Sequence, residues 1–534
     1  MTRTLSILVA AVAILTVSAT TASPLQADDA LTNMELDILR VCEGVIQLFA
    51  SHAADIWPGY DLSERPFLVY IPDRWALLMN CGDGAEGFGP PPRNWPDVGA
   101  EVCFKEGQVG NLVGQLAFGY DAGGVRTVAV GFPESMSESF EDLELKMLAY
   151  VVHEAFHEYQ DEVFGDIEWA REQEYPIEDV ENAALAYLEM ALLVDAVEAA
   201  WADDAGLASE ATAQFVAVRA HRWARADSFI ATYEGGKETR EGTARYVELR
   251  CLDFARVLDY ESSVRDAPPL MDDLAHAALP GYLLDDFRDS MRDGAIPVED
   301  LPRNRIYAVA SAQGFLLDYF DVDWQPEAER STLDFTYASL LGERLGLSQE
   351  DHAALIESAK ARHGYPELLA AAGRSIESHL AAYREASAVF EQQQGTRIEI
   401  AFDTNGLYRS RATSATRLVV DRGAHELCHR YDVYTLERDG TFFELHDAGL
   451  LEVNDYDAYR KTVVFYAPSV DTVTVDGDAS AAPASTASVT DEHGAEGRHF
   501  TALRIVGDGF ELTHDGPGTI TVGASGMVVD LTAK

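Results

Sequence analysis

The hydrophobic pattern of this chain changes its period near Gly395, and that change limits the folds open to it. Before Gly395, apolar residues recur at helical spacing, as in 180–200 and 238–258. After it, apolar and polar residues alternate, as in 397–402 and 461–466. A period of about 3.6 residues indicates a helix with one buried face, whereas a period of two indicates a half-buried strand. The sequence therefore predicts an α+β protein that ends in an all-β, sandwich-like accessory domain over 395–534.

The helical part is expected to follow a small sheet. After a helix over 31–51 come short apolar runs bounded by Pro, Asp and Gly, which are typical of strands. These runs lie at 67–71, 75–79, 101–104, 115–120 and 125–131. A long amphipathic helix then begins near 137–139 and continues to about Val163. We expect an α/β subdomain with this sheet over 28–135 and a mostly helical domain over 136–392.

Residues 1–27 have the pattern of a signal peptide. Arg3 supplies the positive charge, 5–17 is apolar, and small residues up to Ala27 offer cleavage sites. An uncleaved membrane anchor is the alternative, although the apolar run is short for a span. No later run is apolar enough to cross a bilayer, so we expect a secreted or periplasmic protein with no membrane partner after signal removal.

The chain is strongly acidic, with 90 Asp and Glu against 40 Lys and Arg and a formal net charge of -50. A surface of this charge repels nucleic acid, which excludes nucleic acid as an expected partner. The five cysteines match no zinc-knuckle or redox spacing. Export permits disulfides; Cys81 and Cys103 are the closest pair, and the odd count leaves at least one thiol unpaired.

The segment 151–157 reads Val-Val-His-Glu-Ala-Phe-His inside the long predicted helix. Residues four apart stand on one helical face, so His153 and His157 can bind one metal ion from the same side. Glu154 can then face a metal-bound water and act as a general base. The alternative is a solvated helical face that carries two histidines by coincidence.

A catalytic zinc site needs a third protein ligand and an open position. Glu241 is the preferred candidate, because Gly242 and Ala244 beside it would let its helix approach the motif helix closely. Competing carboxylates are found elsewhere in the predicted helices, at Glu181, Glu189 and Glu238.

Two short motifs, HEAFHEYQ at 153–160 and EGTARYVE at 241–248, resemble those of the gluzincin metallopeptidases of the peptidase MA type. The resemblance covers about 67–324. It implies a zincin-like fold in which His153, His157 and Glu241 hold Zn²⁺ and Glu154 is the catalytic base. It also implies a Tyr or His that stabilises the oxyanion, for which Tyr246 and Tyr307 are the candidates. In that architecture the strands at 67–71 and 125–131 would supply an edge strand, along which an extended peptide could lie.

One position departs from that pattern. The longer zincin motif prefers an uncharged residue after the second His, and this chain has Glu158 there. We expect its carboxylate to hydrogen-bond a ligand His from outside the metal shell.

The β region carries one further cluster, His425, Cys428 and His429. Its flanks predict a strand, and a strand does not place residues four apart side by side, so a metal site there is disfavoured.

These patterns favour a secreted zinc-dependent hydrolase, a metallopeptidase that acts on a peptide or protein substrate. A metal hydrolase of another amide or ester fits the same motifs. A non-catalytic exported binding or adhesion protein on a zincin scaffold is the alternative from a different class. The oligomeric state is left open.

Overall fold

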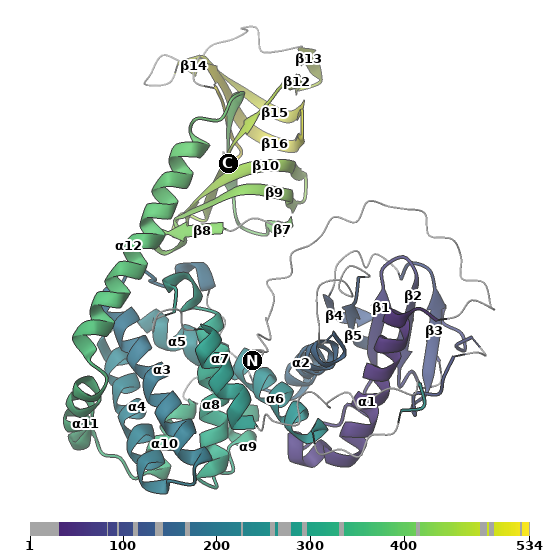
Figure 1. Cartoon of the computed structure of the whole chain (residues 1–534). Helices are drawn as coiled ribbons and strands as arrows, with labels where there is room; N and C mark the ends of the chain where they lie inside the picture. Colours follow the sequence, from purple (N-terminus) through teal and green to yellow (C-terminus); the bar gives the residue numbers. More distant parts are fainter. Residues whose placement is uncertain are drawn as a thin grey trace. The chain divides into compact units, whose positions relative to one another are not determined.

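The computed structural model describes residues 31–532 with short gaps (Figure 1). The gaps are at 83, 93–94, 110–115, 134–142, 166–170, 226–227, 257–261, 265–278, 291–295, 331–335, 413–416, 481–488, 491–495 and 524–525. The signal-peptide prediction for 1–27 and the predicted start of the motif helix near 137–139 both lie outside the described residues.

The chain forms two compact units, and its α+β class is confirmed. The first unit contains the described residues before Arg171 together with Glu181–Ala371. The second contains Arg171–Val180 and Ala372–Lys534. The division into domains at 28–135, 136–392 and 395–534 stays a prediction.

A five-stranded sheet forms the first part of unit 1, in the order β3-β2-β1-β5-β4. The strands are β1 (Phe67–Ile71), β2 (Trp75–Met79), β3 (Val102–Glu106), β4 (Leu116–Asp121) and β5 (Arg126–Gly131). β1 pairs antiparallel with β2 and parallel with β5, with Leu68 opposite Ala129. The strands at 67–71 and 125–131 do not supply the edge, because β1 lies between β2 and β5 and β5 lies between β1 and β4. The edge strand next to them is β4, antiparallel to β5. β1 and β2 are buried throughout, which fits their unbroken apolar sequences.

The first helix, α1 (Asn33–Ile56), lies alongside this sheet (Figure 1). It begins at a capping box in which Thr32 accepts from the Glu35 backbone N–H and Glu35 accepts from the Thr32 N–H. The other oxygen of Glu35 accepts from Trp75 Nε1 at 2.8 Å, so this carboxylate also ties the helix to β2.

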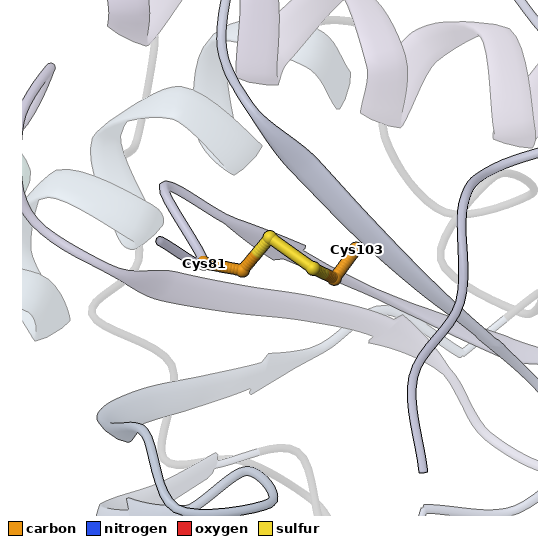
Figure 2. Close-up of a disulfide and its surroundings, with 2 residues drawn as sticks. All are labelled: Cys81 and Cys103. Atoms are coloured by element: carbon orange, nitrogen blue, oxygen red, sulfur yellow. A yellow bond between two sulfur atoms is a disulfide. The ribbon is translucent and has the colours of Figure 1, made fainter. Parts of the chain in front are cut away.

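A disulfide joins Cys81, just after β2, to Cys103 in β3 (Figure 2). It is the pair closest in sequence. The other three cysteines, Cys42, Cys251 and Cys428, are buried free thiols.

Helices make up the rest of unit 1. The helix with the two histidines is α2 (Leu143–Val163), which packs against α1, β5 and a later helix, α6. The others are α3 (Val180–Trp201), α4 (Ala205–Arg225), α5 (Ser228–Lys237), α6 (Thr243–Ala255), α7 (Leu279–Ser290), α8 (Asn304–Tyr319), α9 (Gln325–Arg330), α10 (Tyr337–Arg344) and α11 (Gln349–Arg362). A π-helical turn, Glu238–Gly242, connects α5 to α6 without a break in the helical backbone. No helix in the described parts of the chain is both long enough and apolar enough to cross a membrane.

Unit 2 is mainly one continuous ladder of strands. After α12 (Tyr365–Phe390) the strands are β6 (Thr396–Asp403), β7 (Tyr408–Ala412), β8 (Arg417–Val420), β9 (His425–Arg438), β10 (Thr441–Asp455), β11 (Arg460–Ala467), β12 (Val470–Val475), β13 (Asp478–Ser480), β14 (Val489–Thr490), β15 (Glu496–Gly507), β16 (Phe510–Gly523) and β17 (Gly526–Asp530). β16 pairs with β10 as well as with β15 and β17, so β10, β11, β6, β17 and β16 close a ring. Buried residues such as Ile400, Phe443 and Phe465 fill its core.

Candidate metal centre

Helix α2 presents two histidines that share one face. His153 and His157 lie one turn apart, their ring centroids are 5.0 Å apart, and both side chains are almost fully buried. Their neighbours Val151, Val152 and Phe156 are buried in the core, which fixes the rotation of the helix. The sequence pattern therefore placed both imidazoles correctly.

Glu241 completes the group from the π-helical turn. Its Oε2 atom lies 3.5 Å from His153 Nε2 and 3.6 Å from His157 Nε2. One ligand atom from each residue lies within 4.8 Å of the other two, and no other such group occurs in the described ranges. Donors about 2.1 Å from a tetrahedral zinc ion would lie roughly 3.4 Å from one another. The spacing of the three donors therefore suits a metal ion.

The close packing around Glu241 has a different origin from the one predicted. A Cβ atom on Gly242 would lie 2.1 Å from the Cβ of Ala310, so this glycine lets the turn approach α8 and not the motif helix. α8 carries Tyr307, whose hydroxyl donates to Glu241 Oε2 at 2.8 Å. Gly242 thus allows the close packing on α8 that brings Tyr307 to Glu241.

The outer nitrogen of each imidazole is held by an acceptor. His153 Nδ1 lies 3.2 Å from Glu248 Oε2, and His157 Nδ1 lies 2.6 Å from Gln160 Oε1. Gln160 Nε2 donates to the Arg240 carbonyl at 2.7 Å, so its oxygen faces the histidine. Since carboxylates and amide oxygens only accept, each Nδ1 carries a proton, which leaves Nε2 as the nitrogen that could bind a metal ion in place of a proton.

Glu158 does not perform the role expected of it. Its carboxylate contacts the Gly119 backbone N–H and Arg126 Nε, the latter at 3.4 Å. Glu248 and Gln160 are the residues that hold the ligand histidines. Glu248 follows Glu241 by seven residues, or two helical turns, and that spacing could have revealed it.

The group has the electrostatics of a cation site. Burial opposes a charged His153, but the hydrogen bonds that its ring donates to Glu241 and Glu248 outweigh burial and raise the pKa of His153 to about 10. Burial also raises the pKa of Glu241, yet the two histidines and Lys237 hold that pKa well below its ordinary value. A buried carboxylate in this state requires a positive partner, either a proton on a histidine or a metal ion in its place.

Glu154 and Tyr307 lie in the same neighbourhood. Burial raises the pKa of Glu154, although the charges of His153 and His157 oppose the shift. The Tyr307 ring centroid is 6.1 Å from that of His153. Burial, followed by the charge of Glu241, raises the Tyr307 pKa, so its hydroxyl stays protonated and able to donate.

The second tyrosine candidate is placed differently. The Tyr246 hydroxyl donates to Asp318, and its ring packs edge-on against Trp324 at 5.0 Å between centroids. Tyr246 is thus part of the aromatic core, whereas Tyr307 contacts a member of the cluster.

The competing carboxylates all have arginine partners. Glu181 pairs with Arg225 at the surface. Glu189 is fully buried and pairs with Arg219 and Arg222, and Glu238 pairs with Arg219 at 2.7 Å.

The histidines of the β region do not form a site. His425 contacts Asp421 at 3.0 Å, while Cys428 is buried and His429 is exposed on the same strand. Alternation along β9 therefore separates Cys428 from His429, as expected for a strand.

Taken together, two imidazoles and a carboxylate converge on one point beside a buried glutamate and a phenol. This donor set can hold a divalent cation such as Zn²⁺ with a position left for water or substrate. Comparison with known proteins finds no family model, no curated protein and no solved structure that matches this chain. The interpretation of the site therefore depends on its own geometry.

Proposed function

We propose that this chain is an exported zinc-dependent hydrolase, a metallopeptidase of the gluzincin type. The observation that carries the proposal is the convergence of His153 Nε2, His157 Nε2 and Glu241 Oε2, with both outer ring nitrogens held by acceptors. A coincidental pair of helical histidines would not be expected to have this second layer of contacts.

Each residue of the site has a defined role in the proposal. His153, His157 and Glu241 would hold the ion, which when bound activates a water and polarises a substrate carbonyl. Glu154 would take the proton from the attacking water and pass it to the leaving amine. Burial raises the pKa of Glu154, which makes its carboxylate a stronger proton acceptor.

Tyr307 would stabilise the negative oxygen that develops on the carbonyl. Its hydroxyl lies 2.8 Å from Glu241 Oε2, so it would be close to a substrate oxygen bound next to that carboxylate. The substrate class in the proposal is a peptide or protein; another amide or ester would need the same chemistry.

The test combines metal analysis with a digest of mixed peptides read by mass spectrometry. We expect about one zinc per purified chain. His153→Ala should lose the metal, whereas Glu154→Gln should keep it and lose at least about a hundredfold in kcat. His425→Ala is the matched control, because this histidine lies in the β region and should change neither quantity.

The outcomes separate the alternatives. A chain that holds no metal would overturn the proposal. A chain that binds zinc but cleaves no peptide, amide or ester would instead favour an exported binding protein on the same scaffold.

A further inference from the structure

Glu158 is a buried carboxylate that the metal group does not use. It follows His157 directly in α2, and its side chain is only 11% exposed. Its Oε1 atom accepts from the backbone N–H of Gly119, and Oε2 faces Arg126 Nε at 3.4 Å. Both partners belong to the edge of the small sheet, Gly119 in β4 and Arg126 in β5.

The contact falls at an irregular point of the edge strand. The β4–β5 register shifts between Ala117 and Tyr120, and Gly119 has a φ of +53°, a conformation that favours glycine. Because the Gly119 N–H points to Glu158, it is not used in the ladder with β5. Glu158 thus connects the bulged part of β4 to α2, the helix that carries the histidines. Figure 1 shows β4 and β5 next to α2.

We propose that Glu158 is a positioning residue that sets the distance of edge strand β4 from the metal ligands. The inference rests on the proposed function and adds to it that an extended peptide substrate pairs with this edge. Since Glu158 is adjacent to His157, a strand held by its carboxylate moves together with the ligand pair. A strand released from it would place the bound peptide at a variable distance from the metal.

The contacts of Glu158 are separate from the packing that holds α2 in the core. α2 is also held in the core by the buried residues Val151, Val152 and Phe156. The partner Arg126 is 66% exposed, so the contact lies at the rim of the sheet. Loss of the carboxylate should therefore free the strand edge and leave the metal ligands in place.

The experiment measures substrate binding, catalysis and strand protection separately in the zinc-loaded chain. In Glu158→Ala we expect KM to rise about tenfold, because both contacts are lost. In Glu158→Gln we expect a rise of about threefold, because the amide oxygen still accepts from Gly119 but lacks the charge that attracts Arg126. In both variants kcat should stay within about twofold and zinc content should be unchanged. The Gly119 amide should exchange with solvent faster in Glu158→Ala.

Glu162→Gln is the matched control. Glu162 lies one turn further along α2 and pairs with Arg65 at 2.8 Å, at a more exposed position. It should leave KM and Gly119 exchange unaltered.

An unchanged KM in Glu158→Ala, or slow exchange of the Gly119 amide in that variant, would overturn the inference. So would a loss of zinc, because it would assign Glu158 to the metal group instead. A wild-type chain without zinc or without cleavage would overturn the proposed function and the substrate role of Glu158 with it. The exchange measurement in that case still decides whether Glu158 holds the strand.

Discussion

The imidazole of His153 is held between two carboxylates, Glu241 on its Nε2 side and Glu248 on its Nδ1 side. Glu248 is itself held by Arg245, which also forms two contacts with Asp286 of α7 at 2.7 Å. His153, Glu248 and Arg245 are almost fully buried. The orientation of the first ligand histidine therefore depends on contacts that reach a second helix beyond it.

Replacing Glu248 tests this dependence. In Glu248→Gln we expect the Kd for zinc to rise about 10- to 100-fold, because the amide no longer strengthens the imidazole as a ligand. Competition with a chelator of known affinity measures the change. Asp253→Asn is the control, because Asp253 lies on the same helix but pairs with Arg256. Equal affinities of wild type and Glu248→Gln would contradict the role assigned to Glu248.

Among the elements, α3 and α4 are joined by three ion pairs, which lie in very different surroundings. Glu181 of α3 pairs with Arg225 of α4 where both side chains are about half exposed, at 44% and 51%. Glu189, further along α3, is fully buried with Arg219 and Arg222. It belongs to a buried network of three carboxylates and three guanidinium groups: Glu189, Glu234, Glu238, Arg219, Arg222 and Arg305.

Two of the three carboxylates in this network, Glu189 and Glu234, make the stability of the fold fall at low pH. Burial raises the pKa of Glu189 and of Glu234, but the neighbouring arginines outweigh it and hold both below the ordinary value of 4.5. A depressed pKa means that the stabilisation is present above the unfolded pKa and is lost as pH falls through the folded value. Glu238 acts in the opposite direction, since burial raises its pKa.

We expect Glu189→Gln to lower the free energy of unfolding by about 3–5 kcal/mol at neutral pH, since it leaves buried arginines without their partner charge. The loss of stability on going from pH 6 to pH 3 should also be smaller than in wild type. Urea denaturation across that range measures both effects.

Glu181→Gln provides the comparison, with an expected loss below about 1 kcal/mol for an exposed pair between the same two helices. If both variants lost the same amount, or if Glu189→Gln kept the wild-type pH dependence, the network would not be a source of stability.

At the scale of the whole molecule, the described part of unit 2 is formed by two separate segments of the chain. The segment Arg171–Val180 follows α2 and ends at the first residue of α3, but it belongs to unit 2. There Glu178 accepts from the Asp421 N–H at 2.7 Å, and Arg422 Nε donates to the Glu174 carbonyl at 3.2 Å. Unit 2 therefore contains more than the C-terminal β region. It also includes a segment that follows α2, the helix with His153 and His157.

A glycine on the β side of this contact offers a test. Gly423 has a φ of +78°, and a Cβ atom there would lie 2.7 Å from the Gln173 carbonyl oxygen and 2.8 Å from the Tyr456 hydroxyl. Gly423→Ala should destabilise unit 2 by more than about 2 kcal/mol and speed proteolysis within 171–180, because the segment must move.

Gly406→Ala separates backbone strain from displacement. Gly406 has a similar φ of +67° but open space around its missing Cβ. It should lose only about 1–2 kcal/mol and leave 171–180 protected. Equal proteolysis of the two variants would argue against a docked segment.

Much of the secondary structure and the pairing of His153 with His157 were predictable from the sequence, because both depend on local spacing. The period of apolar residues marks the strands at 67–71 and 75–79 to the residue, and one helical turn brings His153 and His157 together. Local spacing also gave Glu154 its place beside the first histidine.

Only the tertiary structure decided which distant groups meet. Glu189, Glu238 and Glu241 are all largely buried helical carboxylates, and the sequence cannot assign arginines to two of them and histidines to the third. The same holds for Glu158, which contacts a strand 39 residues away, and for Arg171–Val180, which joins the β region. The physical reason is that helical period and strand alternation act over a few residues. The partners of a buried charge are instead set by how whole elements pack, through contacts between residues far apart in the chain.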